Sequence, residues 1–225
     1  MQQSRKLPAG SKVKKNSFIE AHRRKQLIEI AIETIAKSGL KQASFANIAE
    51  NAGVSKGVIV YYFNNREDLI DQIMSSIQSD VRATITKRLN MQVGSVEKLL
   101  AYVSAFFSFA EENRSKYTAF TELWTTISAK KESNPYGSLA YEECRSYIGK
   151  MLADGQKNGE IIIPDIITAS TVIQGIIDGV IIQWTMSPMQ VDLKMCEKNV
   201  IELIRLYITS NTQNEQPKLA AASSL

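Results

Sequence analysis

Residues 44–66 have the pattern of two short helices joined by a tight turn, and this segment constrains the chain more than any other. Ser44 and Ser55 each stand where a side-chain oxygen can cap the start of a helix. Gly53, between them, supplies the positive φ that a tight turn between two helices requires. The spacing predicts a helix-turn-helix, a motif whose second helix enters the major groove of DNA.

Apolar spacing divides the side chains of this segment between a core and an outer face. The residues expected inside are Ile48, Ala49, Ala52, Val54, Ile59 and Phe63. On the outer face of the second helix, Lys56 can reach a guanine or a phosphate, and Gly57 allows close approach of the backbone. The residues expected to contact or position DNA are Ser44, Ser55, Lys56, Gly57, Val58, Tyr61, Tyr62 and Arg66.

Charge is distributed unevenly along the chain. Residues 1–66 hold 12 Lys and Arg against 4 Asp and Glu, whereas the remainder holds 15 against 19. A basic segment joined to an acidic one is typical of a DNA-binding head on a body that does not touch DNA, because phosphate contacts dominate nucleic-acid affinity. A solvated, basic N-terminal tail would give a similar charge count. The helix-turn-helix pattern is therefore stronger evidence for DNA binding than the charge distribution.

Helical spacing continues over most of the chain, so the sequence predicts an all-α protein. Ser17 and Glu20 fit a capping box at the start of a first helix, which Gly39 ends. The expected divisions are a disordered basic arm at 1–16, the DNA-binding domain at 17–66, a helical body at 67–210 and a disordered tail at 211–225. Within the body we expect helices at about 66–90, 96–112, 116–129, 136–157, 166–186 and 188–210, separated by Gly, Asn and Pro.

Several other classes of protein do not fit this sequence. Cys144 and Cys196 are isolated and form neither a metal cluster nor a disulfide framework. No apolar run approaches the roughly 18 to 20 residues of a membrane span, and the N-terminus lacks the apolar stretch of a secretory signal. We therefore expect a cytoplasmic protein without membrane contact. His22 is the single histidine and no catalytic motif occurs, so we expect no enzyme, no metal and no cofactor.

The segment from Arg24 to Met74 resembles the DNA-binding domain of the tetracycline-repressor family of bacterial transcriptional regulators. The resemblance rests on FANIAENAGVS at 45–55, GVIVYYF at 57–63 and REDL at 66–69. It implies a homodimer that binds operator DNA and whose body, residues 67–210, binds a small effector. Repression relieved by that effector is the default; an activator, or an architectural DNA-binding dimer without effector, is the alternative.

The chain departs from the family pattern on the second helix. Family members often have threonine at the position of Val58, tyrosine at Val60 and histidine at Tyr62. Valine cannot donate a hydrogen bond, but its methyl groups can pack on a thymine methyl. DNA recognition is therefore expected to depend more on apolar contact.

Three further side chains near the second helix have two interpretations each. Tyr61 matches the groove-facing aromatic residue of the family, and its hydroxyl could bind a phosphate. Tyr62 could act in the same way, or one of the two tyrosines could pack back on the first helix. Arg66 replaces the usual lysine and could grip a phosphate or pair with Glu67 or Asp71.

Two helices near the C-terminus have the features of a dimer interface. Gly175 and Gly179 form a stripe of small residues that lets another helix approach closely, and apolar residues recur at helical spacing after residue 199. Packing of both helices within one chain is the alternative. A dimer would place two recognition helices about 34 Å apart on a near-palindromic operator. The expected interface residues are Gly175, Gly179, Ile182, Val200, Leu203, Ile204 and Tyr207.

Large side chains are concentrated in the middle helices, where they could line an effector pocket or simply fill the core. Glu122 or Asp178, if buried among aromatic rings, would favour a cationic effector; an apolar cavity would favour a hydrophobic one. The candidate pocket residues are Tyr102, Phe106, Phe109, Phe120, Trp124, Tyr147, Met151 and Asp178.

Overall fold

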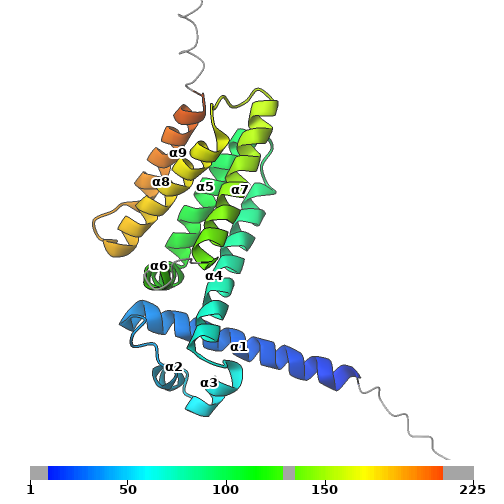
Figure 1. Ribbon diagram of the computed structural model, residues 1–225, viewed down its shortest axis with the longest axis vertical. Helices are drawn as coiled ribbons and strands as arrows, with labels where there is room; N and C mark the ends of the chain where they lie inside the picture. Colours follow the sequence, from blue (N-terminus) through cyan, green and yellow to red (C-terminus); the bar gives the residue numbers. More distant parts are fainter. Residues whose placement is uncertain (1–9, 129–134, 210–225) are drawn as a thin grey trace, which may run out of the picture. The chain divides into compact units, whose positions relative to one another are not determined.

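The computed structural model describes residues 10–128 and 135–209, and within these ranges the regular structure is entirely helical (Figure 1). The chain divides into two compact units, residues 1–77 and 78–225. The helices are α1 Gly10–Ser38, α2 Phe45–Asn51, α3 Lys56–Tyr62, α4 Arg66–Leu89, α5 Ser95–Glu112, α6 Arg114–Ser128, α7 Pro135–Lys157, α8 Ile166–Met186 and α9 Leu193–Thr209. The boundary between the units falls within α4.

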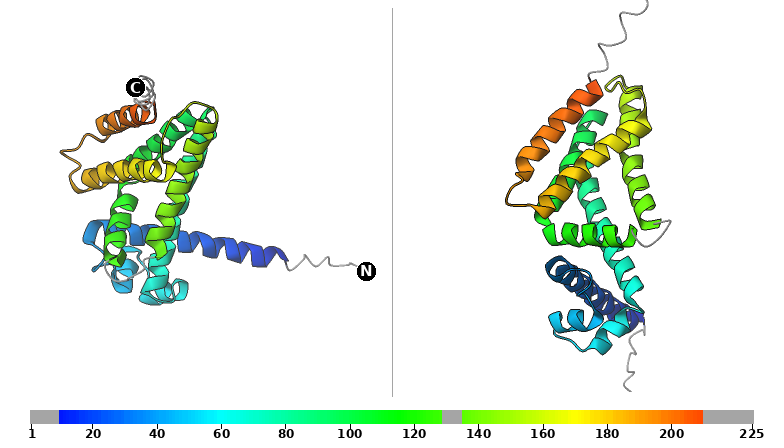
Figure 2. Two further views of the ribbon diagram at one scale, coloured as in Figure 1. Left: turned by 45° about the horizontal axis from the view of Figure 1, so that its top comes forward. Right: turned by 60° about the vertical axis from the view of Figure 1, so that its left-hand side comes forward.

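Helix α1 is longer than the sequence signals indicated, with 29 residues. It begins at Gly10, so the capping box predicted at Ser17 is wrong, and residues 10–16 are helical rather than part of a disordered arm. No glycine or proline interrupts residues 11–38, and the helix therefore continues through the cap signal. Its N-terminal part extends past α2 and α3 (Figure 2). The rest of the expected arm, residues 1–9, and the expected tail, 211–225, lie outside the described residues.

The first unit has a core contributed by α1, α2, α3 and the first half of α4. Ile48 and Ala49 of α2 and Ile59 and Phe63 at α3 are buried as predicted, whereas Ala52 and Val54 are only half-buried. The predicted turn glycines adopt positive φ, 83° at Gly39 and 62° at Gly53. The core also includes Leu27, Ala31, Ile32 and Ile35 of α1 and Leu69 and Ile73 of α4.

The second unit is organised around α5, in which 10 of the 18 residues are buried. Helix α5 packs against α6, α7, α8 and α9, and α8 also lies against α7 and α9 (Figures 1 and 2). The predicted bounds of α4 to α8 are confirmed to within two residues. The last helix starts at Leu193 rather than near Pro188, because the Asp192 carboxylate accepts a hydrogen bond from the Met195 N–H at 3.0 Å and begins the helix there.

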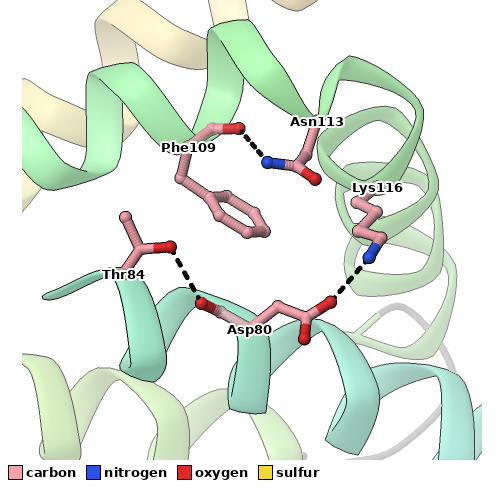
Figure 3. A network of polar contacts seen from close by, with 5 residues as sticks. All are labelled: Asp80, Thr84, Phe109, Asn113 and Lys116. Carbon is pink, nitrogen blue, oxygen red and sulfur yellow. Dashed lines mark hydrogen bonds and ion pairs between the residues drawn. The ribbon is translucent and has the colours of Figure 1, made fainter. Parts of the chain in front are cut away.

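A group of polar contacts joins α4 to the junction of α5 and α6 (Figure 3). Lys116 Nζ of α6 lies 2.6 Å from Asp80 Oδ2 of α4, and both side chains are partly buried. Thr84 Oγ1 donates to the Asp80 carbonyl oxygen at 3.0 Å. Asn113 Nδ2 donates to the Phe109 carbonyl at 3.1 Å and so satisfies the end of α5. The start of α6 is thus held by charge against the middle of α4.

Helix α8 is long and apolar enough to cross a membrane by length and composition, with a mean hydropathy of 1.6. The expectation that no segment reaches this length is therefore wrong for residues 166–186. Core helices of soluble proteins can have the same length and composition. Here α8 packs on α5, α6, α7 and α9.

Gly155 on α7 is required by packing rather than by backbone conformation. A Cβ atom at this position would lie 2.4 Å from Cδ1 and 2.7 Å from Cγ1 of the buried Ile161. Gly155→Ala is therefore expected to lower the free energy of unfolding by about 1–3 kcal/mol, even though alanine is the better helix former. Urea unfolding followed by circular dichroism measures the change.

Gly149→Ala, on the same helix, is the matched control. A Cβ there would lie 3.4 Å from Ile166 and Ser170, which is ordinary contact. We expect unchanged or slightly higher stability for this variant. Equal stability of the two variants would show that Ile161 is not fixed against α7.

Candidate functional site

Of the two serine caps predicted in the helix-turn-helix, the structure contains the first and not the second. Ser44 Oγ accepts a hydrogen bond from the Asn47 N–H at 3.2 Å, which confirms the first cap. The Asn47 side chain also donates to the Gln42 carbonyl at 2.7 Å and ties α2 to the preceding turn. Ser55 occupies the position before α3, but its side chain makes no capping hydrogen bond, so the second side-chain cap is wrong.

The exposed face of α3 consists of Lys56, Gly57, Val60 and Tyr61. Val60 is 53% exposed and Tyr61 is 70% exposed, whereas Val58 is half-buried. Val60 was absent from the predicted DNA contacts, although its departure from the family pattern had marked it. The face available to DNA is therefore one lysine, one glycine and two large apolar or aromatic side chains.

Tyr62 packs back toward α1, which was one of its two interpretations. The guanidinium of Arg24, on α1, lies 5.6 Å from the centroid of the Tyr62 ring and 6.0 Å from that of Phe63. Arg24 Nη1 donates to the Tyr62 carbonyl at 2.8 Å and to Gln72 Oε1 of α4 at 3.2 Å. Arg24, counted from the sequence only as a basic charge, thus fixes the C-terminal end of α3 to two other helices.

Tyr61 is held by two neighbours while its ring remains exposed. The ring meets the Tyr62 ring edge-on, with centroids 5.1 Å apart and an interplanar angle of 87°. The Tyr61 hydroxyl donates to Glu20 Oε1 of α1 at 2.6 Å. This hydrogen bond and the charge of Glu20 raise the pKa of Tyr61 above its ordinary value. The hydroxyl predicted to meet a phosphate already has an anionic partner in the same chain.

Arg66 contacts a backbone carbonyl rather than an acidic side chain. Its Nη2 donates to the carbonyl oxygen of Leu40, in the turn after α1. Pairing with Glu67 or Asp71, one of the predicted alternatives, is therefore wrong for this structure. The contact ties the start of α4, which follows α3 in sequence, to the turn after α1.

A second candidate site lies between α7 and α8. A hollow of about 410 Å³ is lined there by Arg145, Thr171, Gln174, Gly175 and Asp178. It therefore offers a guanidinium, a carboxylate and a primary amide to a ligand. Arg145, Thr171 and Gln174 were not predicted. Polar residues three and four apart on the otherwise apolar helix 166–186 were the sequence signal that could have found Thr171 and Gln174; Arg145, on α7, had no such signal.

Hydrogen bonds connect this hollow to the core of the second unit. The hydroxyl of the fully buried Tyr102 donates to Gln174 Oε1 at 3.1 Å, and Gln174 Nε2 donates to Asp178 Oδ1 at 2.8 Å. Burial, and then the neighbouring Cys144 thiol, raise the pKa of Tyr102; burial raises the pKa of Cys144 to about 11. Both groups are therefore protonated at neutral pH and act as hydrogen-bonding groups.

The predicted aromatic pocket is mostly core. Tyr102, Phe106, Phe109 and Met151 are buried. Phe120, Trp124 and Tyr147 are half-buried, and the Phe120 and Trp124 rings lie 5.6 Å apart. Asp178 lines the hollow and Tyr102 reaches it through Gln174; none of the other predicted pocket residues is part of its lining.

A larger groove of about 550 Å³ lies between the end of α4 and α5. Its basic residues, Lys87 and Arg88, are accompanied by Glu97 and Glu112. Arg88 Nη2 also donates to Ser108 Oγ at 2.6 Å. This mixed lining favours no particular ligand charge, so the groove is the weaker candidate for an effector site.

The predicted dimer residues divide between the core and the surface. Val200 is 4% and Ile204 1% exposed, so both are buried within this chain and cannot form the interface that was expected of them. They face inward because α9 packs on α5 and α8. Ile182 and Gly179 are half-buried, and Gly175 is exposed. The apolar residues exposed on α8 and α9 include Val172, Met186, Met195, Leu203, Leu206 and Tyr207.

A capped helix-turn-helix with an exposed recognition helix, joined to a separate helical body with a polar hollow, is the arrangement of a ligand-responsive DNA-binding regulator. The comparisons with known proteins agree. The model described as "Bacterial regulatory proteins, tetR family" matches residues 27–73, and "BetI-type transcriptional repressor, C-terminal" matches residues 95–210. The chain belongs to the tetR family of bacterial transcriptional regulators.

Two curated relatives show how far the likeness extends. The chain is 26% identical over 185 residues to the fatty acid metabolism regulator protein of Bacillus subtilis (strain 168), covering 80% of this chain and 92% of that protein. It is 33% identical over 110 residues to the regulator BetI of Escherichia coli (strain K12 / DH10B), covering 48% of this chain and 56% of BetI.

Two solved structures share the fold. FadR from Bacillus subtilis in complex with stearoyl-CoA has a TM-score of 0.69 and 24% identity, covering 81% of this chain and 98% of FadR. A putative regulator from Saccharomonospora viridis in complex with choline has a TM-score of 0.70 and 20% identity, covering 84% of this chain and 98% of that one.

Proposed function

We propose that this protein is a cytoplasmic, dimeric repressor that binds a near-palindromic operator and leaves it when a small molecule occupies the hollow between α7 and α8. The observation that supports DNA reading most directly is the face of α3 formed by Lys56, Gly57, Val60 and Tyr61. It is exposed in a unit whose remaining helices are anchored to a shared core. Lys56 can bind guanine or phosphate, and Val60 can pack on a thymine methyl.

Dimerisation through α8 and α9 is supported by two independent features. A Cβ atom at Gly175 or Gly179 would meet nothing within 4 Å in this chain, so packing inside the chain does not require these glycines. Leu203 and Leu206 of α9 are 56% and 61% exposed. They lie three residues apart and so form an apolar patch on one side of the helix, as protein interfaces do. A second copy would bury the exposed apolar residues of α8 and α9, with Gly179 allowing close helix contact beside the hollow.

The effector that we propose is a fatty acyl thioester. The relative matched over most of this chain is named for fatty acid metabolism, and FadR was solved with stearoyl-CoA. In this chain Arg145 can bind an anionic head group. The apolar core around Tyr102 and Phe106, reached through Gln174, could receive an acyl chain if these side chains rearrange.

A cationic effector is the second candidate, because Asp178 also lines the hollow. The body matches the BetI-type model, and one structural neighbour holds choline. A carboxylate beside Tyr102 is suited to a small cation. The two candidates differ in which charged side chain of the hollow binds the ligand, so they can be separated by titration.

Helix α4 connects the unit that carries the recognition helix to the unit that carries the hollow. It starts at Arg66, shortly after α3 ends, and it contacts α6 through the 2.6 Å pair of Asp80 and Lys116 (Figure 3). An effector that prefers one arrangement of α5, α6 and α7 would therefore bias α4 in proportion to its differential affinity. Release from the operator follows when the favoured arrangement spaces the two recognition helices wrongly.

Selection from random DNA followed by DNase I footprinting is expected to yield a near-palindrome whose half-sites lie about one helical turn apart. Lys56→Ala should weaken binding to it and, where Lys56 meets a phosphate, reduce the salt slope by about 1. Lys157→Ala, an equal charge removal in the body, should leave both unchanged. Uniform, strongly salt-dependent protection of any sequence would instead support an architectural DNA-binding protein.

Palmitoyl-CoA is expected to raise the melting temperature and to release the operator, because it binds the native body. Arg145→Gln should weaken its effect about tenfold or more, whereas Lys150→Gln, an exposed lysine on the same helix, should not. Choline is the comparison ligand in differential scanning fluorimetry. Stabilisation by choline alone would establish the cationic candidate, and no response to either ligand would reject both.

Gly179→Leu is expected to convert the dimer to monomers, since a leucine would prevent close approach of two α8 helices, whereas its Cβ atom would meet nothing within 4 Å in its own chain. Sedimentation velocity measures the association state, and circular dichroism shows that the fold is kept. Ala153→Leu, which places a leucine on the exposed surface of α7, is the control. A Gly179→Leu variant that remains dimeric would place the interface elsewhere.

A further inference from the structure

Tyr61 can donate a single hydrogen bond, and in this chain it donates that bond to a carboxylate. The acceptor is Glu20 Oε1, at 2.6 Å from the hydroxyl oxygen. Glu20 belongs to α1 and lies 41 residues away in sequence. The contact is therefore a tertiary one on the exposed side of the recognition helix.

A phosphate oxygen that takes the Tyr61 hydroxyl must replace Glu20 as its acceptor, because a phenol has one proton to donate. The phosphate is an anion, and the carboxylate next to it would repel it. Both consequences oppose binding. The raised pKa of Tyr61 has the same cause, a negative charge beside the hydroxyl.

Glu20 is not needed to hold the Tyr61 ring in place. The ring packs edge-on against Tyr62, whose carbonyl and ring are both held by Arg24. Arg24 is in turn bonded to Gln72 of α4. The aromatic pair therefore keeps a support from two helices when Glu20 is changed.

We propose that Glu20 competes with a DNA phosphate for the Tyr61 hydroxyl and thereby limits the affinity of the recognition helix for DNA. The inference rests on the proposed phosphate contact of Tyr61. It assigns to α1 a negative contribution to DNA binding, in a region whose net charge is strongly positive. Glu20 is then a residue that weakens binding for all sequences, because a phosphate contact does not depend on the base.

The test compares Glu20→Gln with the native chain by fluorescence anisotropy on a random-sequence duplex at several salt concentrations. We expect binding to tighten about three- to tenfold and the salt slope to steepen by up to about 1. Glu33→Gln is the matched control, since Glu33 lies on the same helix and its ion-pair partner, Lys37 at 3.9 Å, is also on α1. Circular dichroism confirms that each variant is folded.

Tyr61→Phe completes a double-mutant cycle. If the hydroxyl carries the competition, Glu20→Gln should have much less effect in the Tyr61→Phe background. NMR of chains with ¹³C-labelled tyrosine gives a second readout, in which the Tyr61 resonance should titrate at lower pH in Glu20→Gln than in the native chain. Equal titration would show that the contact is not kept in solution and would overturn the proposal.

Weaker or unchanged DNA binding by Glu20→Gln would also overturn the proposal, and so would an equal gain with Glu33→Gln. Because the duplex has no operator, this result does not depend on whether selection finds one. A native chain that binds random DNA but selects no palindrome would reject the proposed repressor function and leave the role of Glu20 open to the same test.

Discussion

The DNA-reading surface depends on anchoring a recognition helix that cannot be stable alone. Helix α3 has seven residues, far fewer than the roughly 12 to 15 at which isolated helices become marginal in water. Ile59 and Phe63 bury one side of it, and Arg24 holds its last carbonyl to α1 and α4. These contacts leave Lys56, Val60 and Tyr61 in solvent without loosening the helix.

Local signals in the sequence predicted most of the helix ends, because turn glycines and caps act through their own backbone. Gly39, Gly53 and Ser44 are examples. The contacts of Arg24 and Tyr61 could not be predicted in this way, since their partners lie 38 and 41 residues away. Ser17 shows the opposite error: a good local cap signal has no effect where the flanking residues also favour helix.

Glycines in the body show why the candidate site was harder to predict. Gly155 excludes a side chain because Ile161 fills the space, whereas Gly175 borders the hollow and has open space around it. Both are single glycines within a helix, and they differ only in which residues from other segments pack against them. For the same reason, aromatic residues at helical spacing became core, while Gln174 and Asp178 formed the polar lining.

A regulator of this kind must be able to leave its operator as well as bind it. An effector can shift the equilibrium only by its differential affinity for the two states, and each tenfold change requires about 1.4 kcal/mol. A recognition helix of very high affinity would need a correspondingly large coupling energy. Under the proposed function, Val58 and Val60 lack the polar groups that family members often have at these positions, and Glu20 competes for the Tyr61 hydroxyl. If the first unit binds DNA with moderate affinity, the effector needs to supply a smaller coupling free energy to release the protein from its operator.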